Sequence, residues 1–170
     1  MVVCIVGLPS AAECEGYDRE HMRLPAQMDA LVTALAGATE RLVVVLMGGS
    51  PVALPWVERV PALLLMGLSG QAAGSAMADV LFGAAAPAGR LAETWPLRLE
   101  DVPSTPHFAK HRRQARALPN MAQAQARPSL GTVDLLIWQV VYRETLNVGY
   151  RYFQSAPGRP VLFPFGACAH

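Results

Sequence analysis

Three short segments of the chain are apolar at nearly every position and lack the alternation of a sheet that has one face in water. They comprise residues 2–6, 42–47 and 62–66. Continuous apolar runs of this length are typical of strands that are buried on both faces of a parallel sheet. We therefore expect three neighbouring strands in the core of the protein.

A helical pattern lies between the first two of these segments, over residues 25–36. Apolar side chains recur there with the spacing of one helix face, at Met28, Leu31, Val32 and Leu35. Pro25 suits the first turn of a helix, and Gly37 suits its end. A strand, a helix and a second buried strand in succession predict a parallel pair with a right-handed crossover.

A second helix is expected over residues 71–82, ending at Gly83. Its apolar stripe consists of Ala73, Met77, Val80 and Leu81. The small residues Gly74 and Ala76 predict that this helix lies close to the sheet. Together the elements indicate an α/β layered sandwich, with a mostly parallel sheet flanked by helices.

Composition narrows the classes of function. The chain has 170 residues, of which 52% are hydrophobic and 16% are charged, which indicates one folded domain with a buried core. The net charge of +1 gives no reason to expect nucleic acid or an anionic membrane as partners. No apolar run approaches the ~20 residues of a membrane-spanning helix. The first residues lack the basic region of a signal peptide, so we expect a soluble protein.

The cysteines and histidines show no spacing typical of metal ligands, so we expect no metal and no cofactor. Cys4 lies in a predicted strand and is expected in the core. Cys14 lies between two glutamates, whose negative charge disfavours a reactive thiolate. The cysteines therefore indicate no chemistry of their own.

An acidic segment, residues 13–19, follows the first predicted strand. The glycines of the segment 48–50 follow the second strand, so both lie at the carboxyl edge of the sheet, where α/β proteins bind their ligands. Phosphate binding at Gly48 and Gly49 is disfavoured, because the spacing matches no phosphate-binding motif and Pro51 follows. A sharp turn is the better interpretation, and a flavodoxin-like nucleotide binder is the weakest hypothesis.

Several short motifs recur in an order that resembles a known family. They are Glu13-Cys-Glu-Gly-Tyr-Asp-Arg19, Leu24-Pro25, Val43-Val-Val-Leu-Met-Gly-Gly-Ser-Pro51, Pro55-Trp56, Gly70-Gln71, Ala78-Asp-Val-Leu-Phe-Gly83, Gly89-Arg-Leu91, Glu93-Thr-Trp-Pro96, Val148-Gly-Tyr-Arg-Tyr152 and Phe163-Pro-Phe-Gly166. The set resembles the C-terminal α/β sandwich domain of glycoside hydrolase family 3, the β-glucosidase family. The resemblance covers residues 1–108 and 141–166. It implies one domain over residues 1–166, interrupted by an atypical insertion at 109–140, and a divergent tail at 167–170.

The resemblance implies a divided active site. In this family a (β/α)8 barrel carries the nucleophile, and the sandwich domain lends the general acid/base for retaining hydrolysis of terminal β-D-glycosides. Glu15 is the expected acid/base, because it directly precedes the Gly-Tyr-Asp-Arg segment, and Glu13 is the reserve candidate. Tyr17, Asp18 and Arg19 are weaker candidates for contact with the sugar. For Asp18 and Arg19, an ion pair that fixes the loop is the better interpretation.

The chemistry of such a loop depends on how its carboxyl groups interact. Glu13 and Glu15 are two residues apart, so in an extended loop they project to the same side, and their repulsion raises the pKa of one of them. Without a barrel to supply the nucleophile, we expect these 170 residues alone to be inactive. The expected partners are a barrel domain and a β-glycoside. The alternative function is a non-catalytic remnant or interaction module.

The other matched residues are expected to be structural. Trp56 is predicted to cover the edge of the sheet, and Trp95 and Pro96 to end the sandwich core. By the resemblance, Tyr150, Arg151 and Tyr152 are expected to support the active-site region from beneath. The basic residues 110–113 lie in the expected insertion and carry no interleaved aromatic residue. A solvated surface is therefore preferred there over a nucleic-acid site. The apolar residues 135–141 are expected to add a strand or helix.

Overall fold

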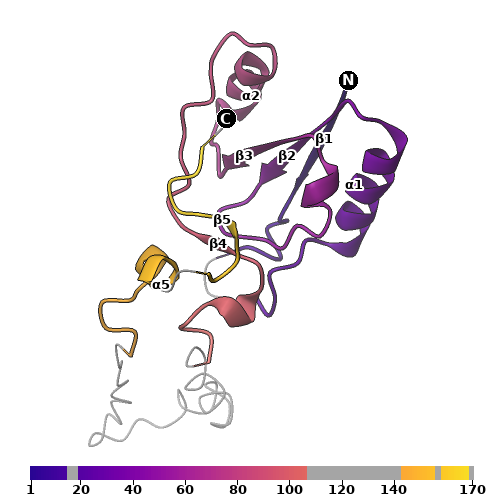
Figure 1. The fold of residues 1–170 in the computed structure, drawn as a ribbon. Helices are drawn as coiled ribbons and strands as arrows, with labels where there is room; N and C mark the ends of the chain where they lie inside the picture. The colour runs from indigo at the N-terminus through magenta and orange to yellow at the C-terminus, as the bar shows by residue number, and fades with distance from the viewer. Residues whose placement is uncertain (15–18, 107–142, 156–157, 169–170) are drawn as a thin grey trace, which may run out of the picture.

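The computed structural model describes residues 1–14, 19–106, 143–155 and 158–168. Its centre is a parallel three-stranded sheet, formed by β1 (Val2–Gly7), β2 (Leu42–Met47) and β3 (Ala62–Gly67) in that order (Figure 1). Val2 lies opposite Leu42, and Val43 lies opposite Ala62. The three predicted strands and their parallel direction are confirmed.

Helix α1 (Ala26–Ala38) connects β1 to β2 and packs on one face of the sheet (Figure 1). Pro25 is its N-cap residue, one position before the first helical residue. The helix runs through Gly37 instead of ending there, and the N–H of Thr39 donates to the carbonyl of Leu35 at 3.0 Å. The α/β arrangement of a mostly parallel sheet flanked by helices is confirmed.

The hydrophobic core lies between α1 and the sheet. Its fully buried members include Val32 of α1 and Leu42, Val44 and Leu46 of β2. Cys4 lies among them as predicted, and burial raises the pKa of its thiol. Residues 2–7 and 42–47 are thus held in register by packing as well as by their hydrogen bonds.

Trp56 belongs to this core and does not lie at an exposed edge. Its side chain is fully buried, directly before the 3-10 helix η1 (Val57–Arg59). The indole N–H donates to Oδ1 of Asp29 at 2.8 Å, so the crossover between β2 and β3 is fastened to α1. A buried indole N–H needs such a partner, and Asp29 supplies it from the first turn of the helix.

The expectation that all three strands are buried on both faces is wrong. Val3 and Ile5 of β1 are 38% and 53% exposed, and no residue of β3 is fully buried. β1 and β3 lie at the two edges of the sheet, and α1 covers the face opposite Val3 and Ile5. Within the described residues, only β2 has a strand on each side, which explains why its side chains are the best buried.

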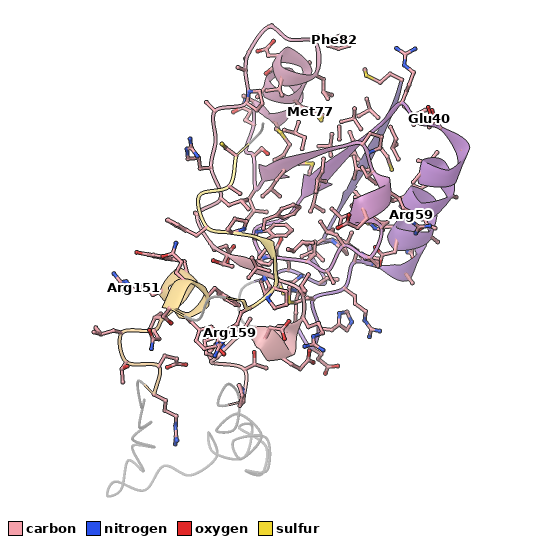
Figure 2. The ribbon with its side chains drawn as sticks, viewed as in Figure 1. Glu40, Arg59, Met77, Phe82, Arg151 and Arg159 are labelled. Carbon is pink, nitrogen blue, oxygen red and sulfur yellow. The ribbon has the colours of Figure 1, made fainter. Side chains whose placement is uncertain are left out.

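Helix α2 (Ala73–Leu81) was expected to lie close to the sheet through Gly74 and Ala76, and this expectation is wrong. Both residues are exposed, and no atom approaches within 4 Å of the position that a Cβ would take at Gly74. The predicted apolar stripe is only half-buried, and Phe82 is 81% exposed at the outer end of the helix (Figure 2). The helix ends at Gly83, as predicted, where φ is +79°.

The remaining elements form a second, smaller layer. Strands β4 (Trp95–Pro96) and β5 (Val161–Phe163) pair antiparallel, and the rings of Trp95 and Phe163 pack at 6.0 Å. Next to them lie the 3-10 helix η2 (Leu99–Asp101) and helix α5 (Tyr150–Ser155) (Figure 1). Trp95 and Pro96 are buried, as expected for the end of the core.

The predicted insertion at 109–140, with its basic cluster and the apolar residues 135–141, lies outside the described residues. Of the helices in the described ranges, none has both the length and the apolar character needed to cross a bilayer.

Candidate active site

The acidic segment begins where β1 ends, at the carboxyl edge of the sheet. A tight turn forms there, in which the N–H groups of Ala12 and Glu13 donate to the carbonyl of Pro9 at 2.8 and 3.1 Å. The N–H of Leu8 continues the pairing with β2 by donating to the carbonyl of Met47 at 3.1 Å. The turn therefore starts from a fixed point and directs Glu13 toward the segment that follows β2.

Both carboxylate oxygens of Glu13 accept a hydrogen bond from that segment. The backbone N–H of Gly49 donates to Oε2 at 2.9 Å, and the hydroxyl of Ser50 donates to Oε1 at 2.6 Å. Desolvation raises the pKa of Glu13, but the hydrogen bonds from Ser50 and Gly49 and the charge of Arg19 outweigh it, so that the pKa lies below the usual glutamate value. Glu13 is therefore ionised near neutral pH.

Arg19 contacts the same turn from the other end of the acidic segment. Its Nη2 donates to the carbonyl of Pro51 at 2.9 Å. Glu13 and Arg19 thus bind consecutive residues of one turn, Gly49 to Pro51. Glu15, Tyr17 and Asp18 are outside the described residues, so the assignment of Glu15 and the Asp18–Arg19 ion pair stay predictions.

The turn at Gly48 and Gly49 is shaped to approach Glu13 closely. A Cβ at Gly49 would lie 2.8 Å from Cδ1 of Leu68 and 3.4 Å from Oε1 of Glu13. The N–H of Gly49, which a phosphate would need, is already donated to a carboxylate. This arrangement supports the sharp-turn interpretation and disfavours nucleotide binding at this position.

A cavity of about 500 Å³ adjoins the turn, and Arg19, Pro51, Glu93, Glu144 and Tyr150 are among the residues that line it. Although Glu93 is exposed as a residue, partial burial of its carboxyl group raises its pKa above the usual value. Glu93 and Glu144 are not predicted as site residues from the sequence. The signal in the sequence was the place of Glu93 directly before Thr94, Trp95 and Pro96, a motif matched to the family. The structure buries Thr94 and Trp95, so the backbone next to Glu93 is held in place.

The expected support of the active-site region by Tyr150, Arg151 and Tyr152 stays a prediction, but one of these residues borders this cavity. Val148, Gly149 and Tyr150 line it, and the ring of Tyr150 stacks on Phe165 at 4.3 Å. None of the residues of α5 is buried. The segment therefore borders the region next to Arg19 without entering the core.

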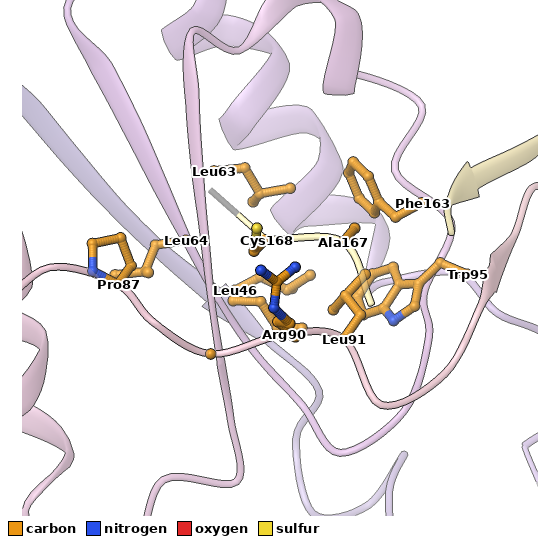
Figure 3. Close-up of a pocket in the computed structure, with 12 residues that line it drawn as sticks. Leu46, Leu63, Leu64, Pro87, Arg90, Leu91, Trp95, Phe163, Ala167 and Cys168 are labelled. Carbon is orange, nitrogen blue, oxygen red and sulfur yellow. The ribbon is translucent and has the colours of Figure 1, made fainter. Parts of the chain in front are cut away.

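A second cavity, of about 360 Å³, lies at the β3 edge of the sheet. Figure 3 shows the side chains that line it, among them Leu63, Trp95, Phe163, Arg90 and Cys168. Its walls are largely hydrocarbon, which suits packing better than recognition of a hydroxyl-rich sugar. In the described part of the chain, no group of three or more His, Cys, Asp or Glu residues is placed to hold a metal ion.

Comparison with known proteins identifies the class to which this fold and loop belong. A sequence profile of the glycosyl hydrolase family 3 C-terminal domain matches residues 1–150. The chain belongs to this family, and the resemblance drawn from its motifs is confirmed.

Several β-glucosidases are similar to this chain in sequence and structure. Thermostable beta-glucosidase B of Acetivibrio thermocellus is 40% identical over 166 residues, which are 98% of this chain and 18% of that protein. The crystal structure of β-glucosidase from Kluyveromyces marxianus in complex with glucose matches 98% of this chain with a TM-score of 0.73 and 36% identity. The Bifidobacterium adolescentis family 3 β-glucosidase matches with a TM-score of 0.75 and 35% identity. The chain spans about a fifth or less of these proteins, at 17% and 21% of the two crystallised chains.

Proposed function

We propose that this chain supplies the acid/base loop of a retaining β-glucosidase, with Glu15 as the general acid/base and the nucleophile contributed by a (β/α)8 barrel outside these 170 residues. The observation that carries the proposal is the state of Glu13. Its carboxylate is ionised and engaged by Gly49 and Ser50, so it is a poor proton donor at neutral pH. Of the two candidate glutamates, Glu15 is therefore the better general acid.

In the proposed reaction Glu15 protonates the glycosidic oxygen while the carboxylate of the barrel attacks the anomeric carbon and forms a glycosyl-enzyme. The aglycone leaves with that proton. Glu15, now ionised, then removes a proton from water as the water attacks the same carbon, which releases the sugar with retained configuration. The position of the loop at the carboxyl edge of the sheet is consistent with this role, because α/β sheets bind ligands there.

The proposed substrate class is drawn from the relatives with the highest identity. These are β-glucosidases, and two of the matched β-glucosidase structures hold glucose, so a terminal β-D-glucoside is the substrate that we propose for the assembled enzyme. Tyr17, Asp18 and Arg19 are retained as candidate sugar contacts. Arg19 is the described member of this set, and it borders the 500 Å³ cavity.

The test is hydrolysis of an aryl β-glucoside by the purified chain, alone and with a separately supplied family 3 barrel domain. We expect no turnover by the chain alone and turnover by the combination. Glu15→Gln should lower the rate about 10²–10⁴-fold for glucosides with poor leaving groups, and azide should restore turnover of activated ones. Glu20→Gln is the matched control, because Glu20 is exposed and lies just beyond Arg19.

Two results would count against the proposal. Turnover by the chain alone that Glu15→Gln abolishes would show that no barrel nucleophile is needed. A complex with the barrel that binds glucoside but is unaffected by Glu15→Gln would favour the non-catalytic interaction module instead.

A further inference from the structure

The segment that contains Glu15 is tied to one turn at both of its ends. On the amino-terminal side, Glu13 accepts hydrogen bonds from Gly49 at 2.9 Å and Ser50 at 2.6 Å. On the carboxyl-terminal side, Arg19 donates to the carbonyl of Pro51 at 2.9 Å. These partners are more than 30 positions away along the chain, so the ties are tertiary contacts and not local loop structure.

We propose that Glu13 and Ser50 are positioning residues for the hydrolysis, and that their hydrogen bond is the latch that holds the Glu15 segment at the carboxyl edge of the sheet. The inference rests on the proposed function of Glu15. The backbone limits how far Glu15 can lie from Glu13, because the two are two residues apart and two residues of chain span at most about 7 Å. Displacing Glu13 therefore displaces the acid/base.

The chemistry of the latch favours a fixed geometry. Both carboxylate oxygens are used, each by a different donor, so rotation of the carboxylate would break two hydrogen bonds together. Hydrogen bonds to an ionised acceptor are shorter and stronger than neutral ones. The turn leaves little free space, since a Cβ at Gly49 would lie 3.4 Å from Oε1 of Glu13 and even closer to Leu68. A side chain used in this way orients its neighbour and is unavailable to the substrate.

The kinetic test compares two substitutions of Glu13 in the chain combined with the barrel. Glu13→Ala removes both hydrogen bonds, and we expect kcat for a glucoside with a poor leaving group to fall about 10–100-fold with little change in KM, as for a misplaced catalytic group. Glu13→Gln keeps an acceptor for the N–H of Gly49 and a polar partner for the hydroxyl of Ser50. It should restore kcat to within about threefold of the unmodified enzyme.

Azide and Ser50 provide further controls. Azide should rescue Glu15→Gln, because that substitution removes the negative charge that repels an anionic nucleophile. It should not rescue Glu13→Ala, which keeps the Glu15 carboxylate. Ser50→Ala should lower kcat less than Glu13→Ala, and the double variant should be no worse than Glu13→Ala alone, since both act through one latch. Azide rescue of Glu13→Ala would overturn the inference by making Glu13 the acid/base. Normal kcat in Glu13→Ala, or an equal loss in Glu13→Gln, would overturn it as well.

A measurement on the chain alone separates the latch from the proposed function. The amide hydrogen of Gly49 should exchange faster in Glu13→Ala and at an unchanged rate in Glu15→Gln, as followed by nuclear magnetic resonance. If that pattern is found while Glu15→Gln leaves activity intact in the complex, the latch exists but the role of Glu15 is wrong. If Gly49 exchanges at the same rate in Glu13→Ala, the latch itself is refuted.

Discussion

Replacing Trp56 by Phe should destabilise the protein by roughly 2–3 kcal/mol. The indole is fully buried between α1 and the sheet, and its N–H donates to Asp29 at 2.8 Å. The change removes buried apolar surface equivalent to about two CH2 groups, at a transfer free energy of about 0.8 kcal/mol each. It also removes one hydrogen bond that contributes about 1 kcal/mol net. For a chain of this size the melting temperature should fall by about 4–12 °C.

Asp29 allows the hydrogen bond to be separated from the packing. Asp29→Ala leaves the buried indole N–H without this acceptor, at a cost of about 1–3 kcal/mol, and removes a favourable charge from the first turn of α1, at about 0.3–1 kcal/mol. Asp29→Asn removes the same charge but keeps an oxygen acceptor. It should therefore cost less than about 1 kcal/mol.

Urea unfolding followed by circular dichroism gives these differences, and a double-mutant cycle gives the coupling between the two side chains. In the Trp56→Phe background, Asp29→Ala should cost no more than Asp29→Asn does in the unmodified protein. Fully additive losses, or a loss below about 0.5 kcal/mol for Trp56→Phe, would refute the view that this hydrogen bond fastens the β2–β3 crossover to α1.

Two further predictions concern Gly7 and Gly37, and Glu13. A Cβ at Gly7 would lie 2.2 Å from the carbonyl oxygen of Met47, so Gly7→Ala should lower the urea midpoint. A Cβ at Gly37, inside α1, would meet nothing within 4 Å, so Gly37→Ala should raise stability by about 0.5–1 kcal/mol. Equal effects of the two substitutions would contradict the close approach at Gly7. Because the pKa of Glu13 is lower in the folded than in the unfolded chain, its stabilisation is present above the ordinary glutamate pKa and is lost as the pH falls through the folded value. Urea midpoints measured from neutral to acidic pH should decline less in Glu13→Gln, and parallel declines would exclude this contribution.

The sequence predicted the parts of the fold that depend on local pattern. The strands at residues 2–6, 42–47 and 62–66 and the helix after Pro25 are present within one or two residues of the expected bounds. An apolar run indicates a strand that is able to be buried, but it does not say which segment covers it. Ile5 and Gly74 were misassigned for that reason, because their exposure depends on what packs against them from elsewhere in the chain.

The sequence predicts where the candidate site lies on the sheet, but it does not predict which hydrogen bonds Glu13 makes there. Consecutive parallel strands end at the same edge of a sheet, which placed the acidic segment and the glycine turn together. That Glu13 bonds Ser50 follows from the three-dimensional course of two loops that are 37 residues apart, and no short spacing encodes it. The lowered pKa of Glu13 was equally hidden, because the neighbouring Glu15 alone would have predicted repulsion and a raised value for one of the pair.

The antiparallel contacts near the carboxyl end of the chain affect how many residues can lie between β4 and β5. Leu91 exchanges backbone hydrogen bonds with Gly166 and Ala167 at 2.9 Å, and β4 pairs with β5 directly beside them. The stretch from β4 to β5 therefore leaves and re-enters the fold at one place. An insertion at 109–140, as expected from the sequence, would roughly double that stretch, and for a flexible loop each doubling of length costs only about 0.6 kcal/mol of chain entropy. Extra residues at this place should therefore lower the free energy of unfolding only slightly, and the sheet and the turn that binds Glu13 should keep their structure.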